Sequence, residues 1–219
     1  MSAPPAERMH EYAAAIRARM AGQSRTILGI AGPPGSGKST FAERLLACFH
    51  PGEAVIVPMD GFHLAQSIIQ DTPLATRKGA PDTFDVSGYV ALLRRLRANH
   101  EPVVYAPTYR RGLEEPIAAS VAVARDVPLV ITEGNYLLAD LPGWREVLPL
   151  LDDAWFVDTP DELRVPGLIS RHIAFGMAAA DAERWANGPD ADNARLVAST
   201  RDRASRVIPW PPDAHVRER

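Results

Sequence analysis

Cysteine is almost absent from the sequence, and long apolar runs are lacking. The 219 residues include a single cysteine, Cys48, so the sequence offers no pair for a disulfide framework and no thiol spacing typical of a structural zinc site. No apolar stretch reaches transmembrane length, and the first residues do not form a basic tip followed by an apolar core. We therefore expect a cytoplasmic protein with no membrane partner.

An excess of positive charge is lacking too. Lys and Arg total 24 and Asp and Glu total 27, which gives a formal net charge of −3. General nucleic-acid binders need a basic face, so we expect no nucleic-acid partner. The hydrophobic content of 46% and charged content of 23% are ordinary for a globular protein. At this length we expect residues 1–219 to form a single α/β domain.

A phosphate-binding motif is the most informative feature that the sequence does contain. Residues 32–39 read GPPGSGKS, a complete match to G-x-x-x-x-G-K-[ST]. The motif follows the apolar run TILGIA and precedes a helical pattern at 39–49, so a strand, a loop and a helix come in the required order. This order disfavours a merely structural Gly-rich turn. The predicted nucleotide-binding residues are Gly32, Pro33, Pro34, Gly35, Ser36, Gly37, Lys38, Ser39 and Thr40.

Each part of the motif has its own chemical role. Glycines let backbone N–H groups turn inward around a polyphosphate. Lys38 supplies a positive charge for the β and γ phosphates, and the Ser39 hydroxyl can bind Mg²⁺. The motif therefore predicts ATP and Mg²⁺ as cofactors.

Apolar strand candidates alternate with helical patterns along the chain, which predicts an α/β fold with a mostly parallel sheet. The expected strands are 26–31, 54–58, 102–105, 128–132, 154–157 and 207–208. The expected helices are 6–20 (within an N-terminal segment 1–22), 39–49, 86–98 and much of 160–203. We expect a long surface loop at 71–85 and a polar turn at 107–112.

Two acids follow predicted strands, at the edge where open α/β sheets bind ligands. Asp60 comes after the strand at 54–58, and Glu133 comes after the one at 128–132. Phosphoryl transfer to a hydroxyl needs an acid that orients or deprotonates the acceptor, and we assign this role to Asp60. We expect Glu133 to hold Mg²⁺, directly or through water, or to grip the acceptor. The alternative for both acids is a cap on a strand or on a neighbouring helix.

Three further blocks resemble one group of P-loop kinases, which contains uridine kinases, bacterial-type pantothenate kinases and phosphoribulokinases. The blocks are MDGFH at 59–63, RKGAPDTFD at 77–85 and ITEGNY at 131–136. The resemblance spans residues 26 to about 206, and is strongest to the nucleoside kinase-like branch labelled "putative fructose transport system kinase". It implies a three-layer P-loop NTPase fold with a small helical lid at about 160–190. It also implies a catalytic base at Asp60 and a Walker B role for Glu133.

The resemblance places acceptor contacts in several of these blocks. The expected acceptor-binding residues are His63, Arg77, Lys78, Tyr109, Arg110, Glu133 and Asn135. Without the resemblance, Arg77 and Lys78 would be read as a solvated loop tip, and His63 as packing beside Phe62. Relatives carry an acid where this sequence has Arg110, and that departure weakens any transfer of nucleoside specificity.

The lid of related kinases carries several arginines that neutralise the transferring phosphoryl group. Arg164 and Arg171 match this pattern and join Lys38 and Asp60 as the expected catalytic residues. Pro166-Gly167 stands where another basic residue is expected. Proline is tolerated only in the first turn of a helix, so the lid helix either starts at Pro166 or is weakened there.

The sequence therefore predicts an ATP-dependent kinase that phosphorylates a hydroxyl of a sugar, a nucleoside or a pantothenate-like small molecule. The alternative is a nucleotide-binding regulatory protein or a degenerate kinase with little phosphotransfer. The guanine-selective Asn-Lys-x-Asp pattern of GTPases is absent. The resemblance leaves a homodimer open.

Overall fold

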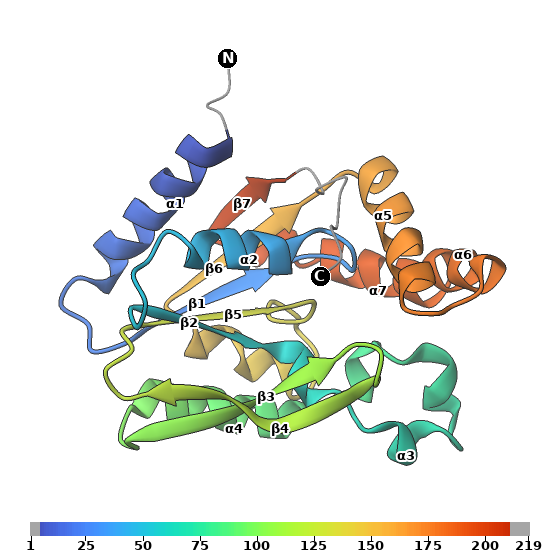
Figure 1. Ribbon diagram of the computed structural model, residues 1–219, viewed down its shortest axis with the longest axis horizontal. Helices are drawn as coiled ribbons and strands as arrows, with labels where there is room; N and C mark the ends of the chain where they lie inside the picture. Colours follow the sequence, from blue (N-terminus) through green and yellow to red (C-terminus); the bar gives the residue numbers. More distant parts are fainter. Residues whose placement is uncertain (1–4, 211–219) are drawn as a thin grey trace.

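A five-stranded parallel sheet forms the centre of the molecule (Figure 1). The computed structural model describes residues 5–210, with side chains from residue 8 onward. Every neighbouring pair in the sheet is parallel. Parallel strands need a crossover connection, and the long segments with helices between the paired strands provide it. In their order across the sheet the strands are β2 (Ala54–Pro58), β5 (Leu129–Gly134), β1 (Thr26–Ala31), β6 (Asp153–Asp158) and β7 (Arg206–Pro209). The predicted α/β fold is confirmed.

Helices cover the sheet on both faces, which gives three layers (Figure 1). α1 (Pro5–Met20) and α2 (Lys38–Leu46) pack on one face, and α4 (Val86–Ala98) packs on the other. Successive residues of β1 point to opposite faces of the sheet and contribute to two hydrophobic cores. Leu28 lies in the core that contains Phe41 of α2, and Ile27 lies in the core that contains Leu93 of α4. All six residues of β1 are buried, as expected for a central parallel strand.

A separate antiparallel hairpin flanks the α4 side of the sheet. It consists of β3 (Val103–Arg110) and β4 (Glu115–Ala124), which pair only with each other within residues 5–210. The predicted strand at 102–105 is therefore too short, and the predicted turn at 107–112 is wrong for residues 107–110, which belong to β3. β4 was missed because its sequence is rich in alanine, which has low strand propensity. Pairing with β3 stabilises this strand.

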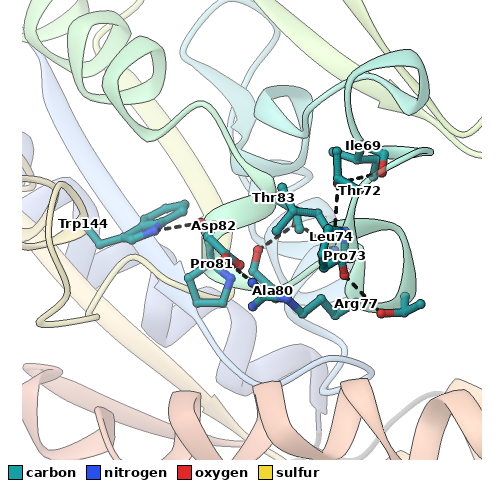
Figure 2. A network of polar contacts seen from close by, with 12 residues as sticks. Ile69, Thr72, Pro73, Leu74, Arg77, Ala80, Pro81, Asp82, Thr83 and Trp144 are labelled. Atoms are coloured by element: carbon teal, nitrogen blue, oxygen red, sulfur yellow. Dashed lines mark hydrogen bonds and ion pairs between the residues drawn. The ribbon is translucent and has the colours of Figure 1, made fainter.

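The connection from β2 to α4 is more ordered than the surface loop predicted at 71–85. It contains α3 (Gln66–Ile69) and short 3-10 turns at Pro73–Arg77 and Pro81–Thr83. Thr83 is fully buried, and its hydroxyl donates a hydrogen bond to the carbonyl oxygen of Ala80 at 2.7 Å. The Trp144 indole donates to the carbonyl oxygen of Pro81 at 3.2 Å (Figure 2). The second half of the connection therefore belongs to the core.

Three helices follow β6 in the sequence and lie at the end of the molecule where the phosphate-binding loop is found (Figure 1). They are α5 (Asp161–Ala174), α6 (Ala179–Asn187) and α7 (Pro189–Ala198). α5 begins at Asp161 and contains Pro166 in its interior, so the lid helix does not start at Pro166. No helix within residues 5–210 has the length and apolar character needed to cross a membrane.

Candidate active site

The phosphate-binding loop joins β1 to α2 in the order that its sequence predicts. Gly35 and Gly37 have φ angles of 78° and 81°, in the left-handed region where a Cβ is unfavourable. α2 begins directly afterwards at Lys38, so its positive end lies beneath the loop. Lys38 is 9% exposed, and burial lowers the pKa of its ammonium, although the carboxylates of Glu133 and Asp60 oppose this shift.

Two side chains fix the carbonyl groups of this loop. Nη1 of Arg164, on α5, donates to the carbonyl oxygen of Pro34 at 2.8 Å. The hydroxyl of Thr159, directly after β6, lies 2.8 Å from the carbonyl oxygen of Ser36 and 2.5 Å from that of Trp210. These contacts attach the loop to α5 and to the end of β6. Arg164 is 3% exposed and does not line the cavity described below, so it supports the loop and does not close over the cavity as predicted.

Asp60 lies in a 3-10 turn, Met59–Phe62, that follows β2 at the edge of the sheet. Its Oδ2 is 3.4 Å from Nη2 of Arg111. Burial alone would raise the pKa of this carboxyl, but the positive charges of His63, Arg111 and Lys38 outweigh burial and hold the pKa below its ordinary value. The carboxylate is therefore ionised at neutral pH.

His63 contacts the same turn. Its Nδ1 is 2.8 Å from the backbone carbonyl oxygen of Asp60, so Nδ1 carries the proton and Nε2 is left as an acceptor. Burial lowers the pKa of His63, with the nearby Asp60 opposing the shift, so the imidazole is neutral at pH 7. The lasting positive charges beside Asp60 are therefore those of Arg111 and Lys38.

Ser39 and Glu133 lie together and have the donor set that Mg²⁺ prefers. The Ser39 hydroxyl donates to Oε1 of Glu133 at 3.1 Å. Oε2 of Glu133 is buried and has no hydrogen-bond partner among the described residues. Burial raises the pKa of this carboxyl, against the opposing charge of Lys38. One hydroxyl and one carboxylate fit a Mg²⁺ ion that takes its other ligands from water and phosphate oxygens.

A cavity of about 460 Å³ lies against Lys38, Ser39 and Asp60. It extends from the loop, past the end of β2, to the β3–β4 turn and the helices α5 to α7. Its lining residues are Pro34, Lys38, Ser39, Asp60, His63, Gln66, Ala75, Lys78, Gly79, Tyr109, Arg111, Glu114, Asn135, Arg171, His172, Phe175, Gly176, Met177, Trp185, Asp190 and Asn193.

Four of the predicted acceptor residues line this cavity: His63, Lys78, Tyr109 and Asn135. Nζ of Lys78 donates to the carbonyl oxygen of Glu114 at 2.8 Å and lies 5.5 Å from the centre of the Tyr109 ring. The ring of His63 lies 4.6 Å from that of Tyr109. These three side chains thus form one wall of the cavity.

Three predicted acceptor residues do not line the cavity. Glu133 lies in β5 beside Ser39. Arg77 points to the exposed carboxylate of Asp82, with which it forms an ion pair (Figure 2). Arg110 is exposed and does not line the cavity. The cavity contains Arg111 in its place. Arg111 was missed because it lies in the turn that follows β3, and no local pattern marks it as part of a site.

Other lining residues were also missed. Glu114 accepts a hydrogen bond from the Tyr109 hydroxyl at 2.9 Å. Nε2 of His172, on α5, lies 2.7 Å from Oδ2 of Asp190, on α7, so this pair ties the lid helix to its neighbour. Trp185, on α6, also lines the cavity. Only the folded chain brings α5 to α7 against the strand ends, so no local pattern marks these residues.

A parallel α/β sheet with a phosphate-binding loop and two acids at its carboxyl edge defines a P-loop nucleotide-binding protein. More narrowly, the chain belongs to the P-loop kinases of the uridine kinase and phosphoribulokinase group, a family of ATP-dependent kinases of small molecules. No family model matches the sequence.

Three comparisons illustrate this membership. "Uncharacterized protein YggC" of Escherichia coli is 35% identical over 190 residues, which are 85% of this chain and 78% of that protein. "Putative uridine kinase C227.14" of Schizosaccharomyces pombe is 31% identical over 169 residues, which are 74% of this chain and 72% of that protein. The crystal structure of a "putative fructose transport system kinase" from Silicibacter sp. TM1040 superposes with a TM-score of 0.81 at 33% identity. That match covers 92% of this chain and 98% of the other.

Proposed function

We propose that this protein transfers the γ-phosphoryl group of ATP to a hydroxyl group of a small molecule. The observation that carries the proposal is one cavity lined by the loop residues Lys38 and Ser39, the carboxylate of Asp60 and the guanidinium of Arg171. A phosphate cradle, a candidate base and a cation over the transferring group are the parts that phosphoryl transfer needs. We further propose that the chain acts as a single kinase domain in the cytoplasm, with α5 and α6 as its lid.

The proposed reaction has one proton transfer and one phosphoryl transfer. The ionised carboxylate of Asp60 accepts the proton of the acceptor hydroxyl, and the oxygen forms a bond to the γ phosphorus. The bond between that phosphorus and the β–γ bridging oxygen breaks, and ADP leaves with the electron pair. Nε2 of His63 is placed to accept a hydrogen bond from an acceptor hydroxyl. Lys38 and the loop amides hold the phosphates of the nucleotide.

Ser39 and Glu133 would hold Mg²⁺. When bound, the ion would neutralise charge on the β and γ phosphates. In its absence, Oε2 of Glu133 is a buried acceptor without a donor among the described residues. This orphaned oxygen supports the assignment, because buried polar atoms normally have partners.

The acceptor is a small molecule bound between the β3–β4 turn and the lid. We propose Lys78, Tyr109 and Asn135 as its contacts, because all three line the cavity. Oδ1 of Asn135 is buried and has no hydrogen-bond partner among the described residues, so it is available to a donor such as a hydroxyl. Sugars, nucleosides and pantothenate-like molecules all present such groups.

The test is ADP release from MgATP in the presence of a panel of hydroxyl compounds. A kinase gives ADP release that is stimulated by one class of acceptor and yields its phosphorylated product. A second candidate is a degenerate kinase that binds nucleotide only, and Pro166 within α5 favours it. For that protein no compound in the panel increases ADP release.

A further inference from the structure

Arg111 is the residue whose placement the proposed function leaves unexplained. It follows β3 directly and lines the cavity with a side chain that is 40% exposed, whereas its neighbour Arg110 does not line the cavity. Its Nη2 is 3.4 Å from Oδ2 of Asp60. A charge-assisted hydrogen bond is about 2.7–2.9 Å long, so the carboxylate does not fully engage the guanidinium. Arginine has five N–H donors, and most of those on Arg111 remain for another ligand.

A second arginine faces the same space from the lid. The Arg111 guanidinium lies 6.0 Å from the centre of the Phe175 ring. Phe175 comes one helical turn after Arg171, and its backbone N–H donates to the carbonyl oxygen of Arg171 at 3.2 Å. Residues four apart lie on one face of a helix. Arg111 therefore stands against the face of α5 that presents Arg171 to the cavity.

The two arginines repel one another, and Arg171 keeps a donor that the carboxylates around it do not use. Nε of Arg171 is buried and has no hydrogen-bond partner among the described residues. Burial, and after it the positive charge of Arg111, lower the pKa of Arg171 to about 10. A buried guanidinium with an orphaned donor and a like charge nearby is stabilised by an anion between the two. The loop residues Lys38 and Ser39 line the same cavity, so a nucleotide phosphate is the anion within reach.

We propose that Arg111 and Arg171 together bind the γ-phosphoryl group as it is transferred. Arg111 thereby supplies, from the β3–β4 turn, the cation that the lid lacks at Pro166-Gly167. Arg164 does not fill this role, because its guanidinium is hydrogen-bonded to Pro34 and Asp161. The inference rests on the proposed function for the identity of the anion, and its test requires no acceptor.

The test compares two probes by calorimetry: MgADP, and MgADP with beryllium fluoride as a mimic of the γ-phosphoryl group. Arg111→Ala should weaken binding of the beryllium fluoride complex about 10- to 100-fold, as loss of charge-assisted hydrogen bonds predicts, and leave the affinity for MgADP unchanged. Arg111→Lys should recover part of the loss. Arg110→Ala is the matched control and should bind both probes as the wild type does.

Three results would overturn the inference. The first is an equal loss for both probes, which would mean that Arg111 supports the loop. The second is no loss for either probe, including the case in which the wild type binds both equally. The third is a loss of affinity for MgADP alone, which would assign Arg111 to the ADP part of the nucleotide. A wild type that binds the beryllium fluoride complex through Arg111, yet phosphorylates no acceptor, would refute the proposed function alone.

Discussion

Arg164 and Pro34 are joined by a hydrogen bond of 2.8 Å that ties the lid helix α5 to the phosphate-binding loop. The arginine is 3% exposed, and Nη2 also donates to Asp161 at 2.7 Å. This pair makes the loop dependent on α5 even without a nucleotide. The first turn of α5 is thus attached to the loop, and its last turn is attached to α7 through His172 and Asp190.

Arg164→Ala should therefore lower both stability and nucleotide affinity. We expect the free energy of unfolding to fall by roughly 1–3 kcal/mol, because a buried carbonyl loses its charged donor. In Arg164→Ala the affinities for MgADP and for its beryllium fluoride complex should fall by the same factor, whereas in Arg111→Ala only the second should fall. Arg184→Ala is the matched control, because Arg184 forms an exposed ion pair with Asp181 at the same spacing and should change stability by less than about 0.5 kcal/mol. Urea unfolding and calorimetry measure both effects.

Asp60→Asn should lower the rate of phosphoryl transfer and leave the affinity for the nucleotide nearly unchanged. The amide cannot accept the acceptor proton, so we expect kcat to fall about 10²- to 10⁴-fold, while MgATP affinity stays within about threefold. Kinetics with the acceptor identified by the ADP-release panel, and calorimetry with MgATP, provide the two measurements. Activity near the wild-type level in Asp60→Asn would show that another group takes the proton.

His63 should make stability depend on pH. Burial lowers the pKa of His63 from its ordinary 6.5, so between the two values the unfolded chain binds a proton that the folded protein does not. The contribution of His63 to the free energy of unfolding is therefore complete above pH 6.5, and it is lost as the pH falls through the lowered pKa of the folded protein. Urea unfolding of the wild type and of His63→Gln, between about pH 7 and pH 5, should show a steeper loss in the wild type. Parallel pH profiles would contradict this expectation.

Replacement of Pro166 should stabilise α5. Proline inside a helix is about 3 kcal/mol less favourable than alanine. The alanine variant loses about 0.4–1 kcal/mol of this gain, because its unfolded chain has more conformational entropy. We expect Pro166→Ala to raise the free energy of unfolding by roughly 1–2 kcal/mol. Gly167→Ala is the control, since no atom lies within 4 Å of its added Cβ, and it should gain about 1 kcal/mol through helix propensity alone. A loss in Pro166→Ala would mean that the proline fits its site without strain.

The sequence was sufficient for the parts of the site that one segment encodes. The loop at 32–39 and the acids after two apolar strands are local patterns, and the fold places Lys38, Asp60 and Glu133 at one edge of the sheet, as expected. Their chemical roles stay predictions. The sheet itself followed from the alternation of strands and helices.

The parts that were missed depend on register and packing. Arg111 lies in the turn after β3, and only the packing of that turn beside Asp60 brings its side chain to the cavity. The contact of Arg164 with the loop depends on where α5 begins, five residues before Pro166, where the sequence left open either a helix start or a weakened helix. A single sequence does not encode either feature as a local motif.

The tip of the β3–β4 hairpin carries Tyr109 and Glu114 in the cavity lining and, between them, Arg111 beside Asp60. A mutation that reshapes this tip therefore changes the cavity lining and the position of the Arg111 cation together. Under the proposed function, a change of acceptor at this hairpin is coupled to a change in turnover, so the two properties evolve at the same few positions.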